Sequence, residues 1–122
     1  MLDATSVVER LWDAMRSRDW DRVEDVIAPH AVIEWPHTGE RFASRDAYVA
    51  VNRGYPEDWD IALKRVIGDQ DRVAALIVVD QDGHALHCCA FYDLFDGRIV
   101  SGVEYWVTAG AVELAPPQQT LV

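Results

Sequence analysis

The sequence predicts an α+β domain in which three helices precede most of an antiparallel β-sheet. Two observations lead to this expectation. Apolar residues recur at helical spacing in the first part of the chain, whereas the second half contains long apolar and β-branched runs separated by short turns. Strands joined by short turns pair with their neighbours, so the helices gather on one side. We expect residues 1–110 to form one domain and residues 111–122 to form a frayed tail.

Two helices are expected before the first strand. Ser6 and Glu9 have the spacing of a capping box, and the helix that they begin runs to about Arg18. Its apolar stripe has the i, i+3, i+4, i+7 spacing and consists of Val8, Leu11, Trp12 and Met15. Asp19 is placed to cap a shorter second helix that Pro29 ends.

A short hairpin and a third helix follow. The strands are expected at residues 31–35 and 41–43, with a turn at residues 37–40. Ser44 is placed to cap a helix that ends near Gly54. The side chains expected to face inward from this helix are Ala47, Tyr48 and Val51.

The remaining chain predicts four strands. They cover residues 61–68 and 72–80, and then the two arms of a long hairpin from His84 to Val107. An Asp-Gly pair at residues 96–97 separates those arms, and this is the strongest short-range signal for a hairpin turn. The second arm has one mixed face, with Gly102, Glu104 and Trp106, and one apolar face, with Val103, Tyr105 and Val107. This asymmetry indicates a lined cavity on one side of the sheet and a packed partner on the other.

Composition restricts the classes of partner. The formal net charge of −10 disfavours nucleic acids and anionic membranes, which need a basic surface. No apolar run approaches the roughly 20 residues that span a bilayer. Cys88 and Cys89 are adjacent and point to opposite faces of a strand, so we expect free thiols. Free thiols without an export signal favour the cytoplasm.

The order of these motifs resembles the SnoaL-like branch of the nuclear transport factor 2-like superfamily. The resemblance covers about residues 6–108. It rests on Leu11-Trp12, on Arg18-Asp19-Trp20, and on residues 31–48 and 96–106. It implies a strongly curved antiparallel or mixed sheet wrapped around three N-terminal helices, which together form a cone-shaped α+β barrel with one internal pocket. This fold carries isomerases, cyclases, hydrolases, dehydratases and non-enzymatic adaptors, so it does not define the function.

The resemblance also assigns the faces of the strands. It implies that Gly102, Glu104 and Trp106 line the pocket. By the same assignment the inward side chains on the other elements are Ile33, Trp35, His87, Cys89, Phe91, Tyr48, Val51, Asn52, Val73, Ala75, Ile77 and Val79. A β-bulge would reverse the assignment of any one strand.

Steroid isomerisation is disfavoured by the same comparison. Ketosteroid isomerases place a carboxylate base where this chain has Trp35, and their oxyanion donors correspond to Leu11 and Phe91. None of these three residues carries the required group.

Glu104 is the candidate catalytic residue, with His87 as its partner. A carboxyl group on a concave wall is partly desolvated, which raises its pKa toward the range of a general acid or base. His87 is assigned to the same face, and histidine is the side-chain type whose ordinary pKa lies nearest to neutral pH, so the pair could pass a proton. The alternatives are an internal glutamate hydrogen-bonded to a tyrosine, histidine or helix amide, and a histidine that only completes the pocket wall.

Seven side chains are candidates for an aromatic ligand-binding wall. They are Trp35, His37, Tyr48, Tyr55, Trp59, Phe91 and Trp106. The alternative is that these rings simply fill the cone. We expect no metal, because only His87, Cys89 and Glu104 could converge and structural zinc usually has four ligands. We expect no cofactor, because no phosphate loop, nucleophile elbow or CxxC pair is present.

The apolar outer face, with Leu86 and Leu94 near it, favours a homodimer. The C-terminal tail is an alternative cover. Three functions remain open at this level: acid–base chemistry on a small hydrophobic metabolite, ligand binding without catalysis, and a dimeric scaffold.

Overall fold

The structure is a computed structural model, and it describes residues 3–56 and 58–108. In chain order the elements are α1 (Ala4–Ser17), α2 (Trp20–Asp25), β1 (Ile27–Trp35), β2 (Glu40–Phe42), α3 (Arg45–Arg53), β3 (Asp60–Asp69), β4 (Arg72–Gln81), β5 (His84–Phe95) and β6 (Arg98–Thr108). The boundary expected at residue 110 and the expected tail lie outside the described residues. No helix in the described part of the chain is long and apolar enough to cross a membrane.

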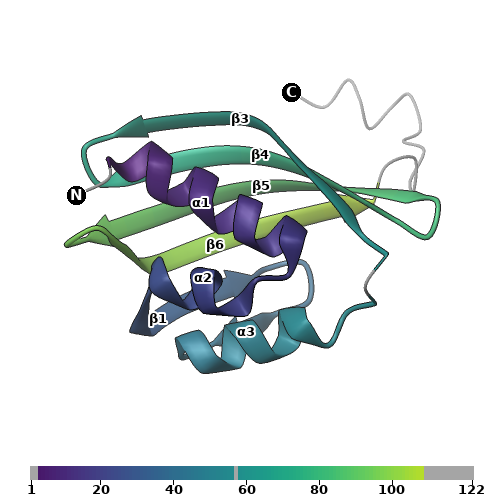
Figure 1. The fold of residues 1–122 in the computed structure, drawn as a ribbon, viewed down its shortest axis with the longest axis horizontal. Helices are drawn as coiled ribbons and strands as arrows, with labels where there is room; N and C mark the ends of the chain where they lie inside the picture. Colours follow the sequence, from purple (N-terminus) through teal and green to yellow (C-terminus); the bar gives the residue numbers. More distant parts are fainter. Residues whose placement is uncertain (1–2, 57, 109–122) are drawn as a thin grey trace, which may run out of the picture.

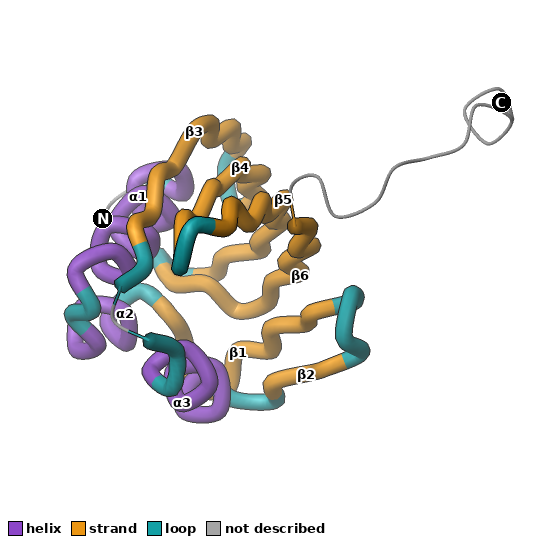
Figure 2. The backbone as a smooth tube through the Cα atoms, turned by 90° about the vertical axis from the view of Figure 1, so that its right-hand side faces the viewer, coloured by secondary structure: helices purple, strands orange, loops and turns teal. Residues whose placement is uncertain are grey.

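The strands form one curved sheet of six strands in the order β2-β1-β6-β5-β4-β3. Neighbouring strands are antiparallel except β1 and β6, which run parallel. The helices cover one side of this sheet (Figure 1), and the second view shows the strands curving around them (Figure 2). The predicted α+β fold, with a mixed curved sheet and three helices, is confirmed.

The first helix has the predicted apolar stripe but begins earlier than expected. Asp3 is the N-cap, and its carboxylate accepts a hydrogen bond from the Ser6 amide at 2.9 Å. The capping box expected at Ser6 is therefore wrong, because a carboxylate three residues earlier already satisfies that amide. The helix ends at Ser17, and its C-cap Arg18 adopts a left-handed conformation with φ 57°.

The second and third helices keep their predicted caps, Asp19 and Ser44. Pro29 does not end the second helix but lies inside β1, where the pairing with β6 is interrupted and no ladder hydrogen bond is needed from its nitrogen. In α3 the expectation for Ala47 is wrong, since that residue is exposed. The buried side chains of this helix are Tyr48, Val49 and Asn52.

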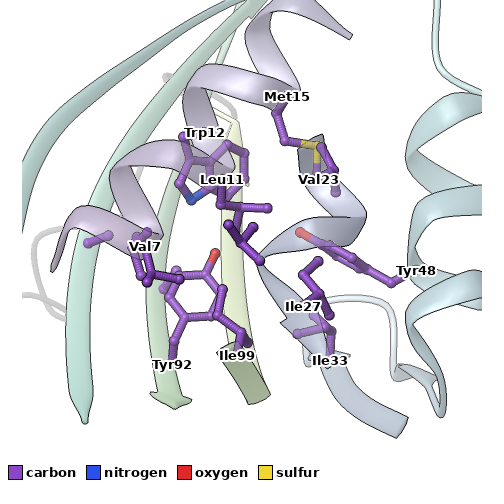
Figure 3. Close-up of a cluster of buried hydrophobic side chains, with 14 of the residues drawn as sticks. Val7, Leu11, Trp12, Met15, Val23, Ile27, Ile33, Tyr48, Tyr92 and Ile99 are labelled. Carbon is purple, nitrogen blue, oxygen red and sulfur yellow. The ribbon is translucent and has the colours of Figure 1, made fainter. Parts of the chain in front are cut away.

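The core lies between the helices and the concave side of the sheet. Figure 3 shows the side chains of α1 and α2 packed over those of β1, β5, β6 and α3. The hydroxyl groups of Tyr48 and Tyr92 both point into this interior, although apolar groups surround them. Both hydroxyl groups donate to the buried carboxyl group of Glu104.

A β-bulge in the β5–β6 hairpin decides which residues face the core. The turn has positive φ at Asp96 and Gly97, as an Asp-Gly hairpin requires. Leu94 lies opposite Ile99, but the next paired residue, Asp93, lies opposite Ser101. One residue of β6 therefore has no partner in β5. Beyond this bulge, each residue of β6 shares a face with the other set of alternating residues of β5.

This bulge makes the predicted orientation of β5 wrong. Directly opposed residues share a face, and Glu104 lies opposite Ala90. Without the extra residue Glu104 would lie opposite Cys89, and the odd-numbered residues of β5 would face inward as predicted. Instead the even-numbered Cys88, Ala90, Tyr92 and Leu94 are buried, while His87, Cys89 and Phe91 are exposed. Leu86 and Leu94 likewise do not join the outer face, because both have inward parity.

Candidate functional site

Glu104 lies in the core as a fully buried carboxyl group. Its Oε1 accepts a hydrogen bond from the Trp35 indole Nε1 at 2.8 Å. Its Oε2 accepts hydrogen bonds from the hydroxyl groups of Tyr48 at 2.7 Å and Tyr92 at 2.6 Å. These three donors come from β1, α3 and β5, so the carboxyl group joins three elements that surround it. The interpretation of Glu104 as an internal glutamate hydrogen-bonded to tyrosine therefore describes its contacts.

Burial raises the pKa of the Glu104 carboxyl above its ordinary value, and hydrogen bonds from Tyr92, Trp35 and Tyr48 oppose that increase. The indole N–H of Trp106 also lowers this pKa, although its geometry falls short of a hydrogen bond. All of these donors are uncharged, so desolvation is the larger effect.

The two tyrosines stay protonated beside this carboxyl group. Burial and the nearby Glu104 raise the pKa of both the Tyr48 and Tyr92 hydroxyls well above the ordinary value. Each hydroxyl therefore keeps its proton and donates to Glu104. We call Glu104, Trp35, Tyr48 and Tyr92 the carboxyl network.

Gly102 leaves the space that the Tyr92 ring occupies. A Cβ atom at this position would lie 2.7 Å from Tyr92 Cδ1 and 2.9 Å from Ile33 Cδ1, both shorter than real contacts of this kind. Since the hydroxyl of Tyr92 is held by Glu104, the ring has little freedom to move away. The glycine was predicted to face the pocket, and its role in admitting Tyr92 became visible only in the structure.

A hollow of about 160 Å³ lies next to the carboxyl network. We call it the aromatic hollow, and it is lined by Trp35, His37, Asn52, Tyr55, Val79, Leu86 and Trp106. Trp35 belongs to both the hollow and the network, because it lines the space and its indole N–H donates to Glu104. Glu104 itself has no exposed surface and is not part of the lining.

Tyr55 lies at the rim of the hollow, and Arg18 fixes the backbone of this part of the rim by hydrogen bonds. The guanidinium of Arg18 donates to the backbone carbonyl oxygens of Arg53, Tyr55 and Pro56, at 3.0, 3.1 and 3.4 Å. The same group lies 4.7 Å from the ring centroid of Trp59. Arg18 thus joins the end of α1 to the segment that follows α3.

The structure brings together some of the predicted site residues and separates others. Trp35, His37, Tyr55 and Trp106 line the aromatic hollow. Tyr48 lies in the carboxyl network, and Trp59 packs against Arg18 and Tyr55 rather than lining the hollow.

His87 and Phe91 lie on the outer face of the sheet, because the β5–β6 bulge reverses their strand. The predicted Glu104–His87 pair is therefore wrong, and so is the place of Phe91 in the ligand-binding wall. Tyr92 was missed for the same reason. The signal that could have found it is the alternative parity of β5, which places a tyrosine rather than a histidine near Glu104.

The thiols and acids offer little to a metal ion. Within the described residues, no group of three or more His, Cys, Asp or Glu side chains is placed to hold one. Burial raises the pKa of the Cys88 thiol, so this residue remains a protonated core side chain. Cys89 is exposed on the opposite face.

Comparisons with known proteins agree with this architecture. A family model described as SnoaL-like domain matches residues 8–102. Among curated proteins, none matches the chain.

Three solved structures show how widely the fold is used. A protein of Kribbella flavida DSM 17836, named as a candidate ketosteroid isomerase, is 24% identical with a TM-score of 0.86, over 98% of this chain and 87% of its own. IdmH of Streptomyces antibioticus, named as a candidate polyketide cyclase, is 20% identical with a TM-score of 0.73, over 87% of this chain and 91% of its own. An LEH-like epoxide hydrolase of M. tuberculosis is 18% identical with a TM-score of 0.69, over 85% of this chain and 82% of its own. At these identities the likeness shows the fold alone.

Proposed function

This chain belongs to the SnoaL-like domain family, and we propose that it binds a small, largely apolar molecule in the aromatic hollow. The observation that carries the proposal is the lining itself. Three aromatic side chains and two aliphatic ones surround the space, and Asn52 and His37 supply polar groups. Binding sites for small molecules combine an apolar wall with a few placed polar groups in this way.

The proposal is tested with benzyl alcohol as the probe, followed by ¹H–¹⁵N NMR of the labelled protein. We expect saturable shifts of the indole N–H signals of Trp35 and Trp106, which line the hollow. Leu86→Trp fills the hollow and should abolish these shifts. Ile67→Trp is the matched control, because Ile67 is 62% exposed and does not line the hollow. Shifts that survive Leu86→Trp, or no saturable shifts in the native chain, would contradict the proposal.

A second candidate function is acid–base chemistry by Glu104 on a molecule in the hollow. The observation that favours it is a buried carboxyl group of raised pKa that is hydrogen-bonded to Trp35, a residue that also lines the hollow. The names of two fold neighbours, a candidate cyclase and an epoxide hydrolase, are compatible with such chemistry. Trp35 or Trp106 would have to move for a ligand to reach Glu104.

This second candidate is tested by measuring the pKa of the Glu104 side chain by ¹³C NMR, with and without saturating benzyl alcohol. A catalytic carboxyl group should change its pKa when the adjacent space is filled. An unchanged pKa would leave Glu104 with a structural role only. Steroid isomerisation stays disfavoured, because Trp35 stands where ketosteroid isomerases place the base and carries no carboxylate.

We also propose that the outer face of the sheet pairs with a second copy of this chain. Large apolar side chains are exposed on it, including Phe91 at 50%, Tyr105 at 47% and Val107 at 62%. A symmetric dimer is the commonest way to cover such a face. Phe91→Glu should shift the mass measured by light scattering from dimer to monomer, and a native chain that is already monomeric would contradict the pairing. The cytoplasm is the proposed compartment, since both cysteines are unpaired.

A further inference from the structure

The burial of the lining residues gives the aromatic hollow an inner end and a rim. Trp35, Asn52 and Val79 are buried and form the inner end. His37 and Tyr55 are exposed and form the rim. The volume of the hollow is about 160 Å³, and an apolar cavity of about 150 Å³ holds one benzene ring. One ring therefore fills the space, and a longer substituent has to leave across the rim.

Asn52 supplies a polar group at the inner end. The residue is 6% exposed, and its Nδ2 donates to the Tyr48 carbonyl oxygen at 2.9 Å, which fixes the direction of the amide. Within the described residues, Oδ1 accepts no hydrogen bond. Asn52 is also not among the described residues whose polar atoms are both enclosed and unpartnered, so this oxygen has surface on the space that the residue lines. Asn52 thus offers a free hydrogen-bond acceptor to a ligand.

The wall formed by Trp106 adds a hydrogen-bond donor. Its indole N–H is buried and has no hydrogen-bond partner in the part of the chain that the structure describes. A buried donor without a partner is unfavourable, so a ligand that carries an acceptor suits this wall better than one that only donates. A hydroxyl group both donates and accepts, and it therefore matches the two polar features of the lining.

The lining offers no compensation for a charged group. None of the seven lining residues is an aspartate, glutamate, lysine or arginine. At the part of the rim that carries Tyr55, the guanidinium of Arg18 donates to backbone carbonyl oxygens and lies against the ring of Trp59. A ligand with a charge at the inner end would lose hydration and would find no opposite charge in the lining. An uncharged polar group avoids this cost.

From these observations we propose that the aromatic hollow selects an uncharged molecule with one ring and a hydroxyl group, bound with the hydroxyl at the inner end. The hydroxyl donates to Asn52 Oδ1, and its oxygen stays available as an acceptor for the wall. Asn52 is then the residue that determines specificity. This inference rests on the proposed ligand-binding function and names the chemical class of the ligand.

The experiment uses four probes of nearly equal size: benzyl alcohol, anisole, ethylbenzene and benzylamine. Anisole accepts hydrogen bonds without donating, ethylbenzene does neither, and benzylamine is a cation at pH 7. Their dissociation constants are measured at pH 7 on the full chain, from the indole signals of Trp35 and Trp106. We expect benzyl alcohol to bind about threefold to tenfold more tightly than anisole or ethylbenzene, which is the size of one uncharged hydrogen bond. Benzylamine should bind more weakly than the alcohol.

Asn52→Leu is the decisive variant, because leucine has a similar size and no polar group. It should abolish the preference for benzyl alcohol over ethylbenzene, while ethylbenzene still binds and so reports that the hollow has formed. His37→Leu removes the polar side chain of the rim and is the comparison. In the native chain, benzyl alcohol should also shift the side-chain amide signals of Asn52 more than ethylbenzene does, and this measurement does not depend on the folding of a variant.

The outcomes separate this inference from the proposed function. If anisole, ethylbenzene or benzylamine binds as tightly as benzyl alcohol, the selection of a hydroxyl group is overturned while ligand binding in the hollow stands. If His37→Leu rather than Asn52→Leu removes the preference, the placement of the hydroxyl at the inner end is overturned. If none of the four probes shifts the indole signals, both the inference and the proposed function fail.

Discussion

Replacing Glu104 with glutamine tests the carboxyl network directly. The amide has the size of the carboxyl group, and its oxygen can still accept from the Trp35 indole. Its NH₂ group, however, replaces the Oε2 atom that accepts from both Tyr48 and Tyr92. The two hydroxyl protons then lose their acceptor in the core, at a cost of about 1–3 kcal/mol for each buried unsatisfied group. Removing a desolvated acid offsets part of this, so we expect a net destabilisation of about 1–3 kcal/mol at pH 4.

The dependence of this destabilisation on pH has a definite sign. The pKa of Glu104 is raised in the folded state, so the native protein holds this proton more tightly than the unfolded chain does. This tighter proton binding adds to the free energy of unfolding, and the contribution is fully present below the unfolded pKa of about 4.5. It is lost as the pH rises through the folded pKa, at about 1.4 kcal/mol per unit of pKa shift. The Glu104→Gln variant has no such group, so the stability difference between the two proteins should shrink as the pH rises.

The assay is urea unfolding followed by tryptophan fluorescence between pH 4 and pH 8. Other carboxylates titrate in both proteins, including Asp3 and Asp13 with lowered pKa values, so only the difference between the two curves is interpreted. Equal m-values confirm that the same surface unfolds in each. A difference that is constant with pH, or that grows as the pH rises, would refute a raised pKa for Glu104.

Three further substitutions test the surroundings of the network and the rim. Gly102→Ala places a methyl group 2.7 Å from the Tyr92 ring, so urea unfolding should show that the free energy of unfolding falls by about 1–3 kcal/mol. A fall below about 0.5 kcal/mol, the size of an ordinary surface substitution, would mean that the ring is free to move. Tyr92→Phe removes a donor that lowers the pKa of Glu104, so the ¹³C titration of that carboxyl group should move to higher pH, and a move to lower pH would contradict the hydrogen bond. Arg18→Met removes three hydrogen bonds to carbonyl oxygens, so hydrogen exchange at Tyr55 should accelerate by about tenfold, whereas unchanged exchange would show that the rim does not depend on Arg18.

Much of the fold could be predicted because local chemistry determines it. The apolar stripe of α1, the caps at Asp19 and Ser44 and the Asp-Gly turn each act within a few residues. The inward orientation of Glu104 and Trp35 was also correct, although the resemblance to a known family supplied the orientation of the sheet.

The partner of Glu104 could not be predicted, because one bulged residue in β6 decides it. Side chains on a strand alternate, so a single extra residue exchanges His87 for Tyr92 beside the carboxyl group. Both parities of β5 offer large apolar side chains, and the local sequence therefore does not favour one over the other.

By itself, then, the sequence determined the order of the elements, the caps at Asp19 and Ser44 and the Asp-Gly turn. Only the tertiary structure decided that Glu104 is held by Trp35, Tyr48 and Tyr92, from elements far apart in the chain. It alone also decided that Arg18 holds the rim near Tyr55. Such contacts depend on how the sheet curves around the helices, and the register that produces this curvature is settled by packing across the core rather than by neighbouring residues.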